Sequence, residues 1–439
     1  MRVSTVKINT KLLNLFNMGS GRVMQALLSF LIVTVLAREL GPDQLGIYSI
    51  VLAIFAYGSH VSEFGMRSIV IRDGNLPNKK IHSEAGLYIC LRLITATLVS
   101  VSTYFVGVIF FPEYAVLAGL VMISTFFIAM QLDWLLLVSK RYLAASWVLV
   151  IRPIFYLAAV LLLVWFEQVS LIMLILAFVS SWGALAIFSW IIVGQSVPKF
   201  TRAGLLNKKG LRLLKEGYPI LGVALVGQAI QSADLIWIGG VYGVVDAGHY
   251  YVASAIIVAA MVFANAMTQI SLGEMSKYID DKGAFSKQLK SDISLILWVG
   301  VFISIGLIYI ISPLIPMVFG YEYKVSGDLI VYFVPYFFLS HVTGILYSSI
   351  IVIGKQKQLL RINIVRAFLL LSGLFIVSYS DNLGYIALMK ALVELVIVIV
   401  IRQYYSYGYL RGILGAIFWP GLIVAIGIGL RGLGDYNVS

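Results

Sequence analysis

Three arginines, Arg22, Arg92 and Arg152, lie inside stretches of sequence that are otherwise almost entirely apolar. Each follows the start of its stretch by about seven to nine residues, which in a helix corresponds to a depth of roughly 10–14 Å. A charged side chain at the centre of a membrane costs about 2.5–3.5 kcal/mol, so such residues usually face a polar interior. Because a guanidinium group donates bidentately to anionic oxygens, the three arginines predict a cationic cavity.

Arg22 has further polar neighbours on its own predicted helix. Gln25 and Ser29 follow it at positions i+3 and i+7, which places all three on one face. We therefore include Gln25 in the predicted substrate-binding set with Arg22, Arg92 and Arg152. The alternative is that the arginines snorkel, with their long side chains reaching the phosphate headgroups of the lipids.

Acidic residues in the apolar stretches are fewer, and we predict ion coupling at Asp133 and Asp234. An isolated carboxylate in a partly dry cavity becomes easier to protonate, which suits exchange with a proton or a sodium ion. Lys390 and Glu394 are spaced i, i+4, and we expect them to neutralise each other on one helix. The scattered histidines and the single Cys90 show no ligand spacing, so neither a metal site nor a cofactor is predicted.

The composition identifies the elements that must hold these charges. Of 439 residues, 61% are hydrophobic and 12% are charged, and the mean hydropathy is +0.97. These values are typical of an all-α integral membrane protein. Apolar runs predict about 12 transmembrane helices, near residues 13–36, 45–66, 85–111, 114–138, 143–166, 169–194, 217–240, 248–272, 292–312, 325–353, 362–379 and 384–401. The glycine-rich run 412–430 is a candidate for a thirteenth span or an interfacial segment.

The basic residues predict the orientation. With a cytoplasmic N-terminus, the cytoplasmic segments carry 24 Lys and Arg residues and the opposite loops carry 3. Such a bias fixes the topology, because positively charged loops stay on the cytoplasmic side. We expect the basic, leucine-containing linker 195–216 to lie amphipathically on the cytoplasmic leaflet.

The chain also contains a duplication. Gly41, Gly46, Tyr48 and Ala53 recur 202 residues later as Gly243, Gly248, Tyr250 and Ala255. The expected organisation is therefore two pseudo-symmetric six-helix lobes, as is common in transporters. The predicted boundaries are 1–194 for the first lobe, 195–216 for the linker, 217–404 for the second lobe and 405–439 for the C-terminal apolar segment.

Residues 37–48, ARELGPDQLGIY, with Gly65, Arg67 and the stretch 234–250, resemble the polysaccharide-biosynthesis flippases of the multidrug/oligosaccharidyl-lipid/polysaccharide exporter superfamily. This resemblance implies a transporter of undecaprenyl-pyrophosphate-linked oligosaccharides, working by alternating access from the cytoplasmic to the outer face of a bacterial inner (plasma) membrane. It implies membrane lipids, the lipid-linked substrate and other polysaccharide assembly proteins as partners. Leu235 follows Asp234 where many relatives carry a basic residue, which puts an ion pair at this position in doubt.

Other classes fit less well. The sequence has no nucleotide-binding loop and no nucleophile motif, which argues against an enzyme, and its basic residues share no soluble face for nucleic acid. A cation-coupled multidrug exporter would be expected to carry an acidic group in the first lobe, where span one instead carries Arg22. An integral-membrane saccharide polymerase normally needs a large outer loop, and the outer loops here are short.

Overall fold

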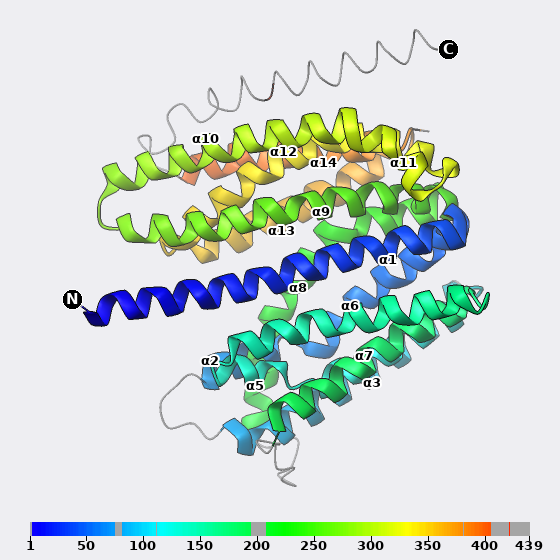
Figure 1. Cartoon of the computed structure of the whole chain (residues 1–439), viewed down its shortest axis with the longest axis horizontal. Helices are drawn as coiled ribbons and strands as arrows, with labels where there is room; N and C mark the ends of the chain where they lie inside the picture. Colours follow the sequence, from blue (N-terminus) through cyan, green and yellow to red (C-terminus); the bar gives the residue numbers. More distant parts are fainter. Residues whose placement is uncertain are drawn as a thin grey trace. The chain divides into compact units, whose positions relative to one another are not determined.

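A computed structural model describes residues 2–74, 81–110, 112–194, 208–380, 382–404 and 421, with most side chains from residue 21 onward. Every element in these ranges is helical (Figure 1). Short turns are η2 (Ser276–Tyr278), the π turn η3 (Leu307–Ile311) and η4 (Tyr321–Tyr323). The α-helices are α1 (Arg2–Glu63), α2 (Met66–Gly74), α3 (Ile81–Phe110), α4 (Ala115–Met130), α5 (Asp133–Val138), α6 (Tyr142–Trp165), α7 (Leu171–Val193), α8 (Lys208–Val241), α9 (Val244–Met275), α10 (Lys282–Gly306), α11 (Ser312–Phe319), α12 (Lys324–Val352), α13 (Gln356–Val377) and α14 (Gly384–Tyr404).

The first helix contains a sharp break. Gly41 has φ 68° and ψ 173°, a conformation that residues with a Cβ rarely adopt, and Pro42 follows it without an N–H for the helix. In the described chain, eleven segments are long and apolar enough to cross a membrane, and the first of them, Val23–Glu63, contains this break. That segment therefore supplies two crossings, which confirms the prediction of about twelve transmembrane helices. The candidate thirteenth span, 412–430, lies outside the described residues apart from Gly421.

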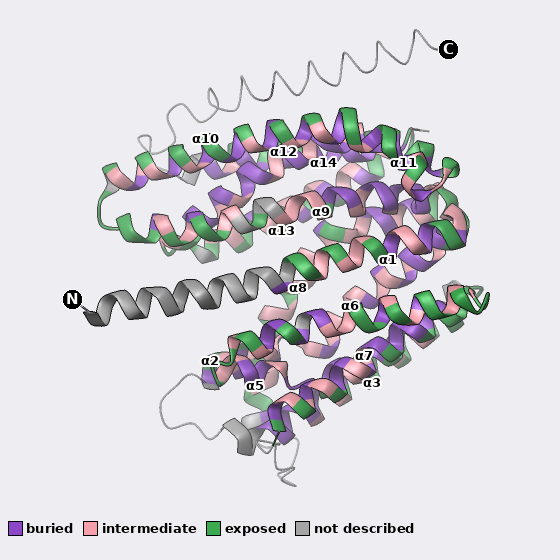
Figure 2. Cartoon of the chain, in the orientation of Figure 1, coloured by how far each residue is buried: buried purple, intermediate pink, exposed green. Residues whose placement is uncertain are grey.

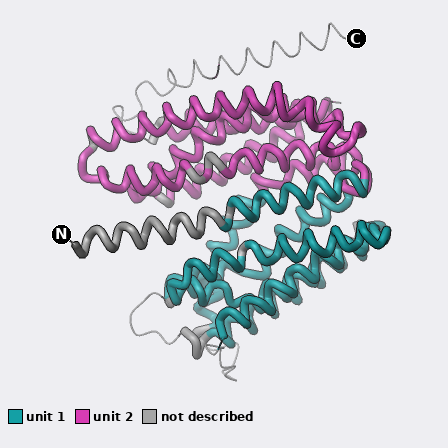
Figure 3. The backbone as a smooth tube through the Cα atoms, viewed as in Figure 1, with its two compact units in different colours: residues 1–40, 47–228 teal, residues 41–46, 229–439 magenta. Residues whose placement is uncertain are grey.

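The chain divides into two compact units (Figure 3). Unit 1 holds residues 1–40 and 47–228, and unit 2 holds residues 41–46 and 229–439. The division falls inside α8, whose first turns pack within unit 1, whereas the predicted lobes were separated by a linker at 195–216. Leu213 and Leu214 pack against the hydrophobic core of unit 1. These two leucines of the predicted amphipathic segment therefore contact protein.

The core of unit 1 surrounds two aromatic residues. Trp134 and Tyr88 are almost fully buried, and their rings meet edge to face with centroids 5.0 Å apart. Around them pack side chains from α2, α3, α5, α6 and α7. The buried faces of α4 and α7 continue this core along the unit.

In unit 2 the core lies along α12, which packs against α9, α10 and α14. Its buried face carries Phe333, Phe337 and Leu346. Figure 2 shows α10 alternating between buried and exposed residues along its length. Large apolar side chains stand on the outside of the unit, among them Phe302 at 80% exposure and Met317 at 77%. Such surfaces suit lipid, because a water-facing surface would carry many more charges.

The duplicated glycines make a reciprocal contact within unit 2. A Cβ on Gly46 would lie 1.7 Å from the carbonyl oxygen of Val244, and one on Gly248 would lie 2.0 Å from that of Pro42. Val244 is the counterpart of Pro42 in the repeat, and Gly248 is the counterpart of Gly46. Gly46 therefore contacts Val244 in the same way as Gly248 contacts Pro42. This pairing is the self-complementary contact of a two-fold axis, and it supports the pseudo-symmetric duplication.

Candidate functional site

Arg152 lies midway along α6, where its guanidinium group faces two aromatic rings of α7. The guanidinium carbon is 4.8 Å from the centroid of the Trp182 ring and 5.6 Å from that of Phe178. These distances define cation–π contacts, which hold the charge in place while leaving the N–H groups in its plane available for hydrogen bonds.

The same place offers donors without a matching acceptor. Among the described residues, no carboxylate forms an ion pair with Arg152. The buried indole Nε1–H of Trp182 also lacks a hydrogen-bond partner in that part of the chain. A buried donor without a partner is rare in proteins. A positive charge beside a vacant N–H donor therefore favours an anionic ligand.

Aromatic packing fixes these two groups. Phe178 meets Phe55 edge to face at 5.2 Å and Tyr156 at 5.6 Å between ring centroids. The hydroxyl of Tyr156 in turn pairs with that of Tyr48 at 2.6 Å. Helices α1, α6 and α7 thus converge around Phe178. We call Arg152, Trp182, Phe178, Tyr156 and Tyr48 the arginine–aromatic site.

Helix α1 approaches the same side of α6. A Cβ on Gly21 would lie 2.4 Å from the hydroxyl oxygen of Ser146, so the two helices touch there. The side chain of Arg22 lies outside the described residues, and Gln25 is partly buried. Because Ser146 precedes Arg152 by six residues, Arg22 lies about 8 Å nearer the start of the helices than Arg152 does. These two residues therefore lie at different depths, whereas the sequence predicted a common depth.

Arg92 has a different setting, on α3 in the interior of unit 1. Its side chain is 1% exposed, pairs with Glu63 at 3.3 Å and lies 5.1 Å from the centroid of the Tyr88 ring. Its Nε and Nη1 atoms have no partner among the described residues. Its described contacts are not shared with Arg152, so the structure does not bring these two predicted site residues together.

Asp133 is an ion-paired residue. Arg67 of α2 donates to its carboxylate at 2.5 Å. Burial alone would lower the pKa of Arg67, but the carboxylates of Asp133 and Glu63 outweigh it and raise that pKa above its ordinary value. The predicted coupling carboxylate is therefore held by a fixed cation.

Asp234 is also paired, with a partner that is far away in sequence. Lys390 of α14 contacts its carboxylate at 2.5 Å, and the Tyr250 hydroxyl donates to the same oxygen at 2.6 Å. All three side chains are buried. Asp234 thus has an ion pair although Leu235 stands where many relatives carry a basic residue.

The prediction that Lys390 and Glu394 neutralise each other is wrong. Glu394 pairs instead with Arg366 of α13 and accepts a hydrogen bond from Thr343 of α12 at 2.9 Å. The two residues share one helix, but each is buried against a different neighbouring helix, where an interhelical pair avoids the cost of an unpaired buried charge. The two ion pairs thus link α14 to α8 and α13, and the Thr343 hydrogen bond links it to α12.

The aromatic half of the arginine–aromatic site was missed by the sequence analysis. Phe178 and Trp182 are spaced i, i+4 on one apolar helix, which is the spacing that places two rings on one face. No local sequence pattern predicts that Arg366 pairs with Glu394, because the two residues belong to different helices.

Helices that cross the membrane many times, with charges buried between them, define the class of this protein as a multi-pass membrane protein. Its fold is that of transporters. It is similar to a solved structure of the lipid II flippase MurJ in an inward closed conformation, with a TM-score of 0.75 and 14% identity over 95% of this chain and 92% of that one. It is also similar to a MOP superfamily transporter from Pyrococcus furiosus, with a TM-score of 0.58 and 14% identity over 94% of this chain and 96% of that one. An outward-facing multidrug resistance MATE transporter gives a TM-score of 0.55 at 15% identity, with 94% of both chains covered.

The family follows from the sequence. A family model described as polysaccharide biosynthesis protein matches residues 35–328, and the chain belongs to this family. The match includes all of ARELGPDQLGIY and confirms the family predicted from that motif. No curated protein matches the chain.

Proposed function

We propose that this protein is a flippase that moves undecaprenyl-pyrophosphate-linked oligosaccharides from the cytoplasmic to the outer face of a bacterial inner membrane by alternating access. The observation that carries the proposal is the arginine–aromatic site, where the guanidinium of Arg152 and the vacant indole N–H of Trp182 offer donors without a carboxylate partner in the described chain. Such a site suits a pyrophosphate group. Membership of a polysaccharide biosynthesis family supports a saccharide as the rest of the substrate.

The structural support for the other predicted site residues differs between Arg22 and Gln25 on one hand and Arg92 on the other. Arg22 and Gln25 lie on α1, which touches α6 at Ser146, so they belong to the same side of unit 1 as Arg152. Arg92 is buried against Glu63, and we assign it to the site only in a conformation in which that pair opens. Its two unpartnered nitrogens are consistent with a second set of contacts in such a conformation.

A cation-coupled multidrug exporter is the second candidate, because the fold is also that of a MATE transporter. A cationic drug needs an anionic site. Within the described chain, Asp133 and Asp234 both carry a basic partner, which disfavours this alternative.

The test is deletion of the gene followed by complementation. We expect the deletion strain to accumulate a lipid-linked glycan on the cytoplasmic side and the wild-type gene to restore its export. Arg152→Ala should export little and Arg152→Lys should remain impaired, because lysine keeps the charge but lacks the planar fork. Loss of one charge-assisted contact is expected to lower substrate affinity about ten- to a hundredfold.

Arg141→Ala is the matched control, since this arginine precedes the same helix, is exposed and donates to the carbonyl of Ile192. It should export normally at equal expression. A deletion strain that accumulates no lipid-linked glycan would exclude the proposed function, and full export by both Arg152 variants would exclude the arginine–aromatic site from it.

A further inference from the structure

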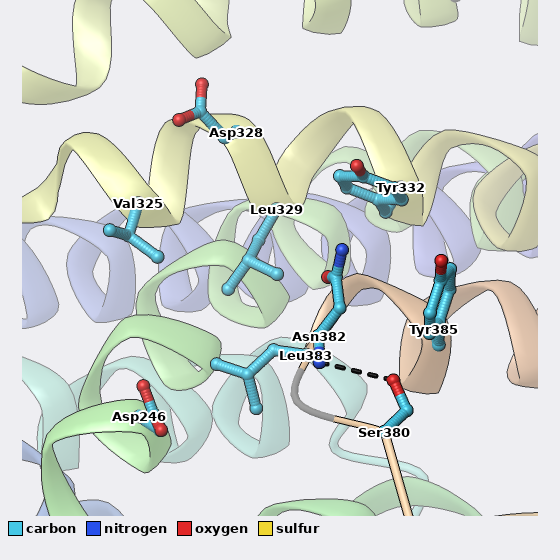
Figure 4. A pocket seen from close by; sticks show the side chains of 9 residues that line it. All are labelled: Asp246, Val325, Asp328, Leu329, Tyr332, Ser380, Asn382, Leu383 and Tyr385. Atoms are coloured by element: carbon cyan, nitrogen blue, oxygen red, sulfur yellow. Dashed lines mark hydrogen bonds between the residues drawn. The ribbon is translucent and has the colours of Figure 1, made fainter. Parts of the chain in front are cut away.

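Unit 2 contains a cavity that the proposed function does not use. Its volume is about 610 Å³, within the range of roughly 300–1,000 Å³ that is typical of small-molecule sites. It lies where α9 and α12 begin, beside Ser380 and where residues 382–383 lead into α14 (Figure 4). The lining residues are Asp246, Val325, Asp328, Leu329, Tyr332, Ser380, Asn382, Leu383 and Tyr385.

The lining has the chemistry of a carbohydrate site. Two carboxylates, one amide and three hydroxyl groups can hydrogen-bond to sugar hydroxyls. The rings of Tyr332 and Tyr385 supply flat surfaces for the apolar faces of a sugar, and Leu329 and Leu383 add apolar surface between the polar groups (Figure 4). None of the nine lining residues is Lys, Arg or His. The two carboxylates would repel a phosphate, so the cavity is unsuited to the pyrophosphate end of the substrate.

The walls of the cavity are held in place by the chain itself. A Cβ on Gly384 would lie 2.7 Å from the Tyr332 ring, so this ring rests directly on the backbone that starts α14. The Asn382 side-chain oxygen accepts from the Gly384 N–H at 2.8 Å. The Tyr242 hydroxyl lies 2.9 Å from the carbonyl oxygen of Ser380 and 3.0 Å from that of Val377. A site built on fixed groups binds with less loss of conformational freedom.

A metal ion fits the cavity less well than a saccharide. Figure 4 shows the Asp328 side chain projecting from α12 away from Asp246, with the α12 ribbon between the two carboxylates. Among the described residues, no group of three or more acidic, histidine or cysteine side chains could hold a metal ion. The volume also far exceeds that of one ion and its ligands.

We propose that this cavity binds neutral sugar residues of the translocated glycan on the side of the membrane where the glycan leaves. The inference rests on the proposed function and on its topology, in which the loop before α9 is extracytoplasmic. The arginine–aromatic site would then bind the pyrophosphate end, and this cavity would bind sugar residues after they have crossed. Division of the substrate between the two sites follows from their charges, one basic and one acidic.

The experiment uses the full-length protein in lipid nanodiscs. The probe is the water-soluble oligosaccharide released by mild acid from the lipid-linked glycans of the host membrane, and binding is followed by saturation-transfer NMR. We expect binding to the wild-type protein and about tenfold weaker binding to Tyr385→Ala and Asn382→Ala. Tyr385→Phe should bind nearly as well as the wild type, because the ring is kept. Tyr379→Ala is the matched control, since Tyr379 is 83% exposed near the same connection but does not line the cavity.

Three results would overturn the inference: no binding by the wild-type protein, unchanged binding in both alanine variants, or calcium binding that Asp246→Asn abolishes and that excludes the glycan. Failure here is distinguishable from failure of the proposed function. Arg152→Ala should export little but should leave binding of the pyrophosphate-free glycan unchanged. A chain that exports normally with Tyr385→Ala and Asn382→Ala combined, and binds no free glycan, is a flippase without this subsite.

Discussion

At Arg152, the guanidinium carbon lies 4.8 Å from the centroid of the Trp182 ring, whose own N–H is buried without a partner in the described chain. The ring has two roles that substitutions can separate. Its face contacts the arginine, and its N–H is the second donor of the proposed anion site. A variant that keeps an aromatic face and removes the donor therefore tests the anion directly.

We predict that Trp182→Phe lowers the affinity for the lipid-linked glycan roughly tenfold, because one hydrogen bond to a charged group is lost while the aromatic contact is kept. Binding of the native lipid-linked glycan to the protein in nanodiscs measures the effect. Trp165→Phe is the control, since Trp165 is 81% exposed at the C-terminal end of α6. Equal affinity of the Trp182→Phe variant and the wild type would show that the indole N–H does not contact the substrate.

The second residue-scale prediction concerns Asp234 and Lys390. Removing one partner of a buried ion pair costs about 3–5 kcal/mol, because the other charge remains buried. We expect Asp234→Asn and Lys390→Met to lower thermal stability in detergent separately, and the double variant to recover most of that loss. Stabilities of the four proteins of this cycle give the coupling between the two residues.

The same double variant tests ion coupling. If Asp234 carries the coupling ion, the stable double variant should export glycan without dependence on the proton or sodium gradient. Unchanged gradient dependence in reconstituted vesicles would make the pair structural. Asp133→Asn combined with Arg67→Met gives the equivalent test in unit 1, where the pair is less buried.

The sequence predicted which residues carry charge inside the membrane but not their partners. Arg152 and Asp234 stand out because a charge in an apolar run is costly. Their neighbours are selected by helix packing: Lys390 follows Asp234 by 156 residues, and only the arrangement of α8 and α14 brings them together. The expectation for Lys390 and Glu394 was wrong for the same reason, since spacing along one helix competes with contacts to several others.

At the scale of helices, the break at Gly41 could be predicted because Gly-Pro marks the end of a helix in any context. The contact made by the turn that follows this break could not be predicted from the sequence. Gly46 and Gly248 are ordinary helix glycines in sequence, and only the structure shows that each packs against a backbone carbonyl from the counterpart turn.

We predict that Gly46→Ala and Gly248→Ala each destabilise the protein by about 3 kcal/mol, because the added methyl would lie 1.7 Å and 2.0 Å from carbonyl oxygens. Backbone must move to relieve such a clash, which a side chain cannot do by changing rotamer. The midpoint of thermal unfolding in detergent measures the loss. Gly222→Ala is the control, because a Cβ there would meet no atom within 4 Å, and it should not lower stability. Wild-type stability of both variants would mean that the two turns do not pack as described.

For the whole molecule, the duplication and the segregation of basic residues predict that the start of α8 and the end of α13 lie on opposite sides of the membrane. The start of α8 at Lys208 should be cytoplasmic, and Tyr379, at the end of α13, should be extracytoplasmic. The same assignment places the acidic cavity of unit 2 where glycan leaves the membrane. Topology therefore decides whether the two proposed sites lie on the correct sides.

We predict that, in a background with Cys90→Ser, a cysteine at position 379 reacts with a membrane-impermeant maleimide in intact cells, whereas a cysteine at 208 reacts only after the membrane is opened. Both positions are exposed, so lack of reaction reports the membrane rather than burial. Lys277→Cys tests a second position that we predict to be cytoplasmic, just beyond the end of α9 that is far from the cavity. Its reaction should follow that of position 208. Labelling of positions 208 and 277 in intact cells, with position 379 protected, would show that the topology is the reverse of the one predicted. It would place the acidic cavity on the cytoplasmic side and remove its assignment as a release site for glycan.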